Sequence, residues 1–246
     1  MHRSPVVNQG ISREEIRFWI TPRRIVQILS LVVLALAMAH VGVYLERRFY
    51  HLDYLKGLYR FFNLGQEANL PTLVSSFLLL GAGILILLIW VYERRQRSPF
   101  RWHWFVLGLG FVVMSIDEMA QIHEGIFGIM LGGLAGRGEG IWYYSWTKLF
   151  IPIVILIGLA YIPFLLKLPR KTAVLFLVAG GAFVGAAIGI EMVESYLTYA
   201  QLPGRTLTQL IEESIEMLSV VLLIYALLTY IAERHIAVHF GFANTR

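Results

Sequence analysis

Carboxylate side chains gather in three short segments of an otherwise apolar chain: 115–124 (SIDEMAQIHE), 190–195 (IEMVES) and 211–217 (IEESIEM). Several of these acids are three or four residues apart, so on a helix they share one face. Carboxylates presented in this way, with imidazoles nearby, bind metal ions or pass protons. The candidate metal ligands are His40, Asp117, His123, Glu124, Glu191, Glu194, Glu213 and Glu216.

The acidic segments belong to a chain with the composition of an integral membrane protein. Of its 246 residues 57% are hydrophobic and 15% are charged, whereas a soluble domain has about 25% charged residues. Six apolar segments reach the ~20 residues that cross a bilayer. We therefore predict an all-α integral membrane bundle of six transmembrane helices, with residues 1–246 as one domain. The predicted spans are 22–47, 71–92, 102–124, 145–167, 171–199 and 206–232, with short interfacial helices at 11–20 and 49–64.

The alternating direction of the spans brings the acids to one side of the membrane. The third and fifth spans run in the same direction and carry their acids near the end, while the sixth runs back and carries its acids near the beginning. His40 lies about two turns before the end of the first span, on that same side. We therefore expect one site. Glu118 and Glu212 are its weakest candidates, because Glu118 points away from Asp117 and Glu124 on an ideal helix.

Loop charges predict the orientation of the chain. Fourteen Lys and Arg residues fall on the side of the two termini and seven on the acidic side. The positive-inside rule then places both termini in the cytoplasm. The first 24 residues lack an apolar stretch with a cleavage site, so we expect no cleaved signal peptide. Basic residues in short loops are explained by this topology, and we expect no nucleic-acid partner.

The energetic cost of these acids favours a cation site. An ionised carboxylate at mid-helix in a membrane costs about 2.5–3.5 kcal/mol. Several acids must therefore be protonated or neutralised by cations. The chain has no cysteine, which excludes thiolate ligands, and the donor set suits iron first, with manganese or zinc as alternatives. The number of ligands is sufficient for two metal ions. A solvated network with the arginines on the same side is the alternative interpretation.

Two groups of glycines have different predicted roles. Residues 125–140 contain many glycines and are expected to form a loop that gates the site. Gly181, Gly185 and Gly189 recur every four residues in the fifth span. Such a ridge of small residues allows another helix to pack closely in lipid.

Two motifs carry a resemblance to a known family. EANLPTLVSS (67–76) and SIDEMAQIHE (115–124) resemble a pattern in uncharacterised bacterial multi-pass membrane proteins, a resemblance that implies the bacterial inner (plasma) membrane and no known activity. The Glu pairs at 191/194 and 213/216 are similar to the Glu-x-x-His ligands of ferritin-like di-iron bundles, although a glutamate stands where those proteins have the histidine. Glu212-Glu213 matches only the Glu-Glu pair of intramembrane CAAX-type proteases.

The leading functional hypothesis is a membrane-embedded metal protein whose site opens to the extracytoplasmic side. It would be a di-metal oxidoreductase or hydrolase that acts on a lipid or another apolar substrate; no catalytic residue can be assigned. A cation or proton transporter that uses the same acids as a relay is one alternative. A non-catalytic accessory subunit bound to other membrane subunits is the other.

Overall fold

The computed structural model describes residues 21–50, 56–66, 68–122, 130, 138–144 and 146–236. The described residues form helices joined by short turns, and no strand occurs among them. The elements are α1 (Pro22–Phe49), α2 (Lys56–Phe62), α3 (Leu70–Arg95), α4 (Arg101–Ala120), the 3₁₀ turn η3 (Gly140–Trp142), α6 (Trp146–Lys167), α7 (Arg170–Val184), the π-helix η4 (Gly185–Ile190), α8 (Glu191–Tyr199) and α9 (Arg205–Glu233).

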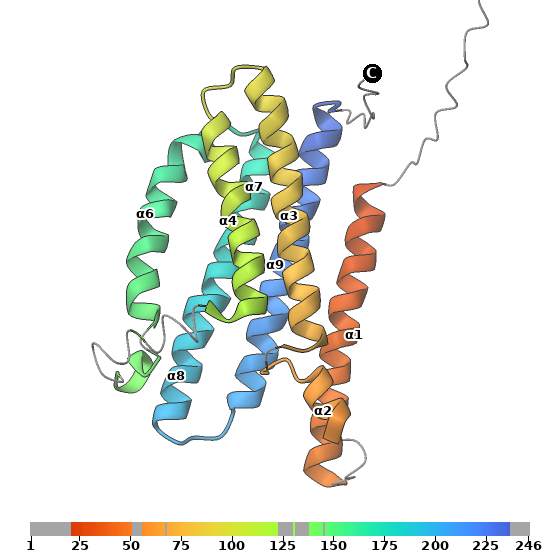
Figure 1. Ribbon diagram of the computed structural model, residues 1–246, viewed down its shortest axis with the longest axis vertical. Helices are drawn as coiled ribbons and strands as arrows, with labels where there is room; N and C mark the ends of the chain where they lie inside the picture. The colour runs from red at the N-terminus through yellow and green to blue at the C-terminus, as the bar shows by residue number, and fades with distance from the viewer. Residues whose placement is uncertain are drawn as a thin grey trace, which may run out of the picture.

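Within the described residues, six helices are long and apolar enough to cross a membrane, as the sequence predicts. They are α1, α3, α4, α6, the continuous α7–η4–α8 segment and α9. The first residues of α1 and the last residues of α9 lie at the same end of the bundle (Figure 1). The opposite end carries α2, α8 and the start of α9, and we call it the acidic end.

Local sequence explains where two of the long helices begin. Thr21 accepts a hydrogen bond from the amide of Arg24 at 3.4 Å, and Pro22 follows it at the first helical position. Asn69 accepts from the amide of Thr72 at 3.1 Å, and Pro71 again lies in the first turn. A polar cap satisfies an amide that has no partner within the helix, and proline has no amide hydrogen to lose there.

Helix α9 lies at the centre of the bundle. It packs against α1, α3, α7 and α8, and 56% of its most apolar stretch is buried, against 6% for α6. Its buried residues Val220, Ile224 and Leu227 belong to the main hydrophobic core. The position of α9 therefore determines which of its acids face inward.

Helices α3 and α4 pack closely through small residues. The hydroxyls of Ser76 and Ser115 are 2.9 Å apart, and each hydroxyl also donates to the other residue's carbonyl. A Cβ added at Gly108 would lie 2.8 Å from Cγ of Leu87. Small residues that allow backbones to approach are typical of helix pairs in lipid.

The predicted glycine ridge does not have this role within the described part of the chain. A Cβ added at Gly181, Gly185 or Gly189 would meet no atom within 4 Å. The ridge faces outward, and the close helix contact in this bundle is made by α3 and α4 instead. Spacing alone identified the ridge, but spacing does not reveal which face is covered.

Two predicted elements have different bounds in the structure, and a third lies outside the described residues. Helix α4 ends at Ala120 rather than at residue 124, because Gln121 adopts a left-handed conformation with φ 56°. The described part of the interfacial segment 49–64 forms the helix only over Lys56–Phe62. The predicted helix at 11–20 lies outside the described residues.

A π-helix interrupts the fifth span immediately before its acids. Gly185–Ile190 has the wider π geometry, and Glu191 is the first residue of the α-helix that follows. An inserted π turn rotates all later side chains relative to those before it, and such turns are frequent at functional sites. The π-helix thus sets the direction in which Glu191 and Glu194 point.

Candidate metal site at the acidic end

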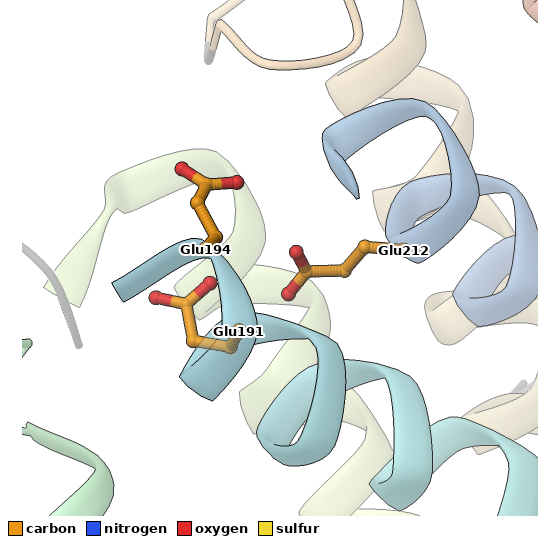
Figure 2. Close-up of side chains that lie close together, drawn as sticks. All are labelled: Glu191, Glu194 and Glu212. Atoms are coloured by element: carbon orange, nitrogen blue, oxygen red, sulfur yellow. The ribbon is translucent and has the colours of Figure 1, made fainter. Parts of the chain in front are cut away.

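Three glutamates from two helices form the candidate site. One carboxylate oxygen each from Glu191, Glu194 and Glu212 lies within 4.8 Å of the others. The first two residues lie in the first turn of α8, while Glu212 reaches across from α9 (Figure 2). All three are buried, with exposed fractions of 8%, 4% and 8%. This is the separation at which three carboxylates can share a cation.

Glu194 is held by donors from the start of α9 and from the segment before α6. Its Oε1 accepts from Nε of Arg205 at 2.9 Å and from Nε2 of Gln209 at 3.0 Å. The hydroxyl of Tyr144 lies 3.4 Å from the same oxygen. These donors fix one carboxylate oxygen, so its direction is set before any ligand binds.

Glu191 and Glu212 interact with each other. One carboxylate oxygen of Glu191 and one of Glu212 lie within 4.8 Å of each other. Nε1 of Trp146 donates to Oε1 of Glu191 at 3.2 Å. Two carboxylates this close repel each other when both are ionised, so a shared proton or cation would stabilise the pair.

Hydrogen bonds join the segment between η3 and α6 to α8, which carries two of the glutamates. The amide of Tyr144 donates to Oγ of Ser195 at 3.0 Å, and that hydroxyl lies 3.4 Å from the carbonyl of Gly140. The Tyr144 hydroxyl also lies 3.2 Å from Oγ1 of Thr198. Burial raises the pKa of Tyr144 above 10.0, so its hydroxyl keeps its proton and donates to Glu194.

The remaining α9 candidates lie beside the group. Glu213 and Glu216 are half-buried and are not among the three clustered residues. The α9 residue in the group is Glu212, which the sequence ranks as the weakest candidate on this helix. Arg205, Gln209 and Glu212 recur at i, i+4 and i+7, so one face of α9 supplies all three to α8.

The candidates from the third span are only partly described. Asp117 is half-buried in the last turn of α4, makes contacts of its own, and is not one of the clustered glutamates. His123 and Glu124 lie outside the described residues. Their predicted role as ligands stays a prediction.

His40 is buried but has a different set of contacts. Its side chain is 1% exposed, and Nδ1 accepts a hydrogen bond from the amide of Leu64 at 3.0 Å. Nε2 is buried and has no hydrogen-bond partner among the described residues. In a neutral ring whose Nδ1 accepts, Nε2 carries the hydrogen. His40 thus offers a donor, whereas a metal ligand needs a lone pair.

The turn that contacts His40 also packs against Gln209, which donates to Glu194. Asn69 donates to the carbonyls of Asn63 and Gln66, both at 2.6 Å, and so shapes this turn. Gly65 within it lies against Gln209, since an added Cβ would collide with the Gln209 amide oxygen. The turn therefore supports the side chain that donates to Glu194.

Sequence reasoning did not identify the donors that surround the glutamates. Arg205 and Gln209 could have been found from their helical spacing with Glu212. Tyr144 and Trp146 carry no such signal, because they precede a different span and reach the glutamates only through the tertiary fold.

A groove elsewhere in the bundle is separate from the glutamates. It has a volume of about 470 Å³ and is lined by α1 and α9 residues that include Met38, Val41, Ile211 and Ser214. None of the three clustered glutamates is among its lining residues. The groove is therefore not part of the candidate site.

The fold and the site together define a helical bundle with six membrane-length helices and a buried three-glutamate group at one end. The chain belongs to the family described as Domain of unknown function (DUF8692), whose model matches residues 26–231. This membership agrees with the predicted resemblance to an uncharacterised family, while the motifs at 67–76 and 115–124 are not tested by it. No curated protein and no solved structure gives a significant match.

Proposed function

We propose that this protein is a multi-pass protein of the bacterial inner membrane whose three clustered glutamates bind a divalent cation. Both termini would be cytoplasmic, and the acidic end would be extracytoplasmic. The observation that carries the proposal is the approach of Glu191, Glu194 and Glu212 to within 4.8 Å while all three are buried.

Charge balance supports a divalent ion. The three carboxylates are accompanied by one guanidinium, that of Arg205, on Glu194. If all three acids are ionised, three negative charges lie within 4.8 Å of one another. Like charges held this close in a buried site repel one another, and a divalent cation would offset that repulsion.

The donor atoms favour a hard cation. The described group offers carboxylate oxygens alone, and such oxygen sites suit magnesium, calcium or manganese. Of the metals that the sequence favours, manganese fits this set best. Iron or zinc would gain more from an imidazole such as that of His123, which lies outside the described residues.

A metal-dependent reaction on a lipid or other amphiphile is the activity that we propose. A hard cation at this site would polarise a substrate oxygen or activate a bound water, which favours hydrolysis over oxidative chemistry. The neighbouring side chains would contribute by orienting the glutamates. Arg205 and Gln209 hold Glu194, and Trp146 holds Glu191.

The core above the site supports this proposal over a transport relay. On α9 the buried residues beyond Glu212 include three polar ones, Ser219, Thr229 and Tyr230, and those between Ser219 and Thr229 are all apolar. On α3 the deeply buried side chains include Leu79 and Ile86. A relay needs polar groups in succession across the membrane, but the buried residues described between Ser76 and Glu93 on α3 and between Ser219 and Thr229 on α9 are apolar or glycine.

Thermal unfolding in detergent tests the proposal. Manganese at about 100 times its dissociation constant should stabilise the folded protein by about 2.7 kcal/mol. The shift should disappear in Glu191→Gln and remain in Glu139→Gln, which changes an exposed acid at the same end. A wild-type protein that no divalent cation stabilises would sink the proposal.

A further inference from the structure

A small pocket lies beside the glutamate group. Trp142, Lys148, Ile151 and Pro152 line it, and its volume is about 220 Å³. It lies between η3 and the first turns of α6, where Lys148 and its neighbours begin that helix.

The segment that lines the pocket also contacts the glutamates. Tyr144 and Trp146 lie between Trp142 and Lys148 in the chain, and they donate to Glu194 and Glu191. One short segment therefore contributes to both sites. A molecule in the pocket would be adjacent to the residues that hold the glutamates.

The pocket supplies a positive charge. Within the described residues the ammonium of Lys148 takes part in neither ion pair that the structure shows. It lies close to the backbone at Gly138, since a Cβ added there would be 3.1 Å from Nζ. A lysine placed at the membrane boundary attracts anionic groups.

The pocket also has apolar walls, and Pro152 in its lining frees a backbone acceptor nearby. Pro152 has no amide hydrogen, so the carbonyl of Lys148 lacks its usual α-helical donor. Trp142 and Ile151 form the apolar part of the lining. A cation, a backbone acceptor and apolar walls together match a headgroup that is anionic and also carries a hydroxyl.

An apolar track leads away from the pocket along α6. Ile155, Leu159 and Ile162 follow Ile151 at helical spacing, and they are 56%, 59% and 46% exposed. The pocket is smaller than the roughly 300–1,000 Å³ that holds a whole drug-sized ligand. It would therefore hold a headgroup while the hydrocarbon chains follow the helix.

We propose that Lys148 and this pocket bind the anionic headgroup of a phospholipid, whose chains lie along the outer face of α6. The inference rests on the proposed function in taking this lipid as the substrate of the glutamate site. It adds a substrate class, an anionic phospholipid, and a residue that selects it.

Native mass spectrometry of the full chain in detergent tests the inference. The probes are phosphatidylglycerol and phosphatidylcholine at equal concentration. Wild-type protein should retain phosphatidylglycerol in preference, and Lys148→Gln should lower that preference at least about fivefold, or about 1 kcal/mol. Lys148→Arg should keep it. Lys167→Gln, at the other end of the same helix, is the matched control and should also keep it.

Several results would overturn the inference. Equal retention of the two lipids by wild-type protein would do so, as would the same loss in the Lys167 and Lys148 variants. Inorganic phosphate in an additional arm distinguishes a lipid site from a site for any small anion. If phosphate at an equal concentration displaces the lipid, the apolar track plays no part and the lipid assignment fails.

The metal content of the same samples separates this inference from the proposed function. Lysine-dependent lipid selectivity in a protein that binds no divalent cation would sink the proposed function and leave the lipid site. A protein that binds a divalent cation but shows no lipid selectivity would overturn the lipid inference and leave the proposed function standing.

Discussion

Arg205 and Glu194 form a salt bridge in which Nε and Oε1 are 2.9 Å apart, and this bridge joins the first turn of α9 to the first turn of α8. Its two members have unequal exposure, with 53% of the Arg205 side chain accessible and 6% of the Glu194 side chain. The guanidinium therefore lies at the boundary of the bundle, while the carboxylate lies inside. This pair orients one edge of the glutamate group.

Removing the guanidinium should make the fold more dependent on a cation. In Arg205→Gln the buried Glu194 loses its charged partner, and the free energy of unfolding should fall by about 1–3 kcal/mol in the absence of divalent ions. Added manganese should restore more stability to the variant than to the wild type, because Glu194 in the variant has lost the positive charge of Arg205. Thermal unfolding with and without manganese measures both effects. Equal manganese shifts in the two proteins would contradict this account.

The glutamates on α9 provide a direct comparison of neighbouring positions. Glu212→Gln should weaken manganese binding by at least about tenfold, or about 1.4 kcal/mol, because Glu212 contributes an oxygen to the group. Glu213→Gln should weaken it by less than about threefold, because its charge acts from beside the group. Isothermal titration of the two purified variants gives both values. The reverse order would show that Glu213 is the ligand.

The sequence could predict at which end of the bundle these acids lie, but not which of them point toward one another. Alternating spans place the acids of α8 and α9 at one end, and Figure 1 shows that end with α8 and the start of α9 together. A choice between Glu212 and Glu213 requires the rotation of α9 about its axis. That rotation depends on the core side chains of the helix and on where α8 lies, and neither is encoded in the spacing of the acids.

His40 should contribute to stability rather than to cation binding. His40→Ala leaves the buried amide of Leu64 without its acceptor, which should cost about 1–3 kcal/mol. His40→Asn provides a carbonyl oxygen near the position of Nδ1 and should recover part of this loss. Manganese affinity should stay within about threefold of wild type in both variants. A loss of cation binding with unchanged stability would instead make His40 a ligand, as the sequence predicts.

Alanine substitutions at two glycines would show which helix faces are packed against other residues. Gly108→Ala places a methyl group 2.8 Å from Cγ of Leu87, so the free energy of unfolding should fall by about 1–3 kcal/mol. Gly181→Ala meets no atom within 4 Å and should leave stability unchanged or raise it by up to about 1 kcal/mol. Chemical unfolding of the two variants in detergent makes the comparison. Equal destabilisation would indicate that a partner covers the ridge at Gly181.

The spans were more predictable than the contacts between them. Length, hydropathy and the cap residues Thr21 and Asn69 define the long helices, because these signals are local. The π-helix at Gly185–Ile190 and the donors Tyr144 and Trp146 depend on tertiary packing. Nothing in the spacing of residues reports such contacts.

Elemental analysis of the purified protein tests the central claim most directly. The account predicts close to one divalent metal ion per chain after expression in manganese-supplemented medium. It also predicts that the ion is lost in the Glu191→Gln/Glu212→Gln double variant. Glu93→Gln is the matched control, because Glu93 is equally buried at 8% exposed but bonds Tyr230 far from the site in the chain. Metal retained by the double variant, or absent from a folded wild-type protein, would contradict the claim.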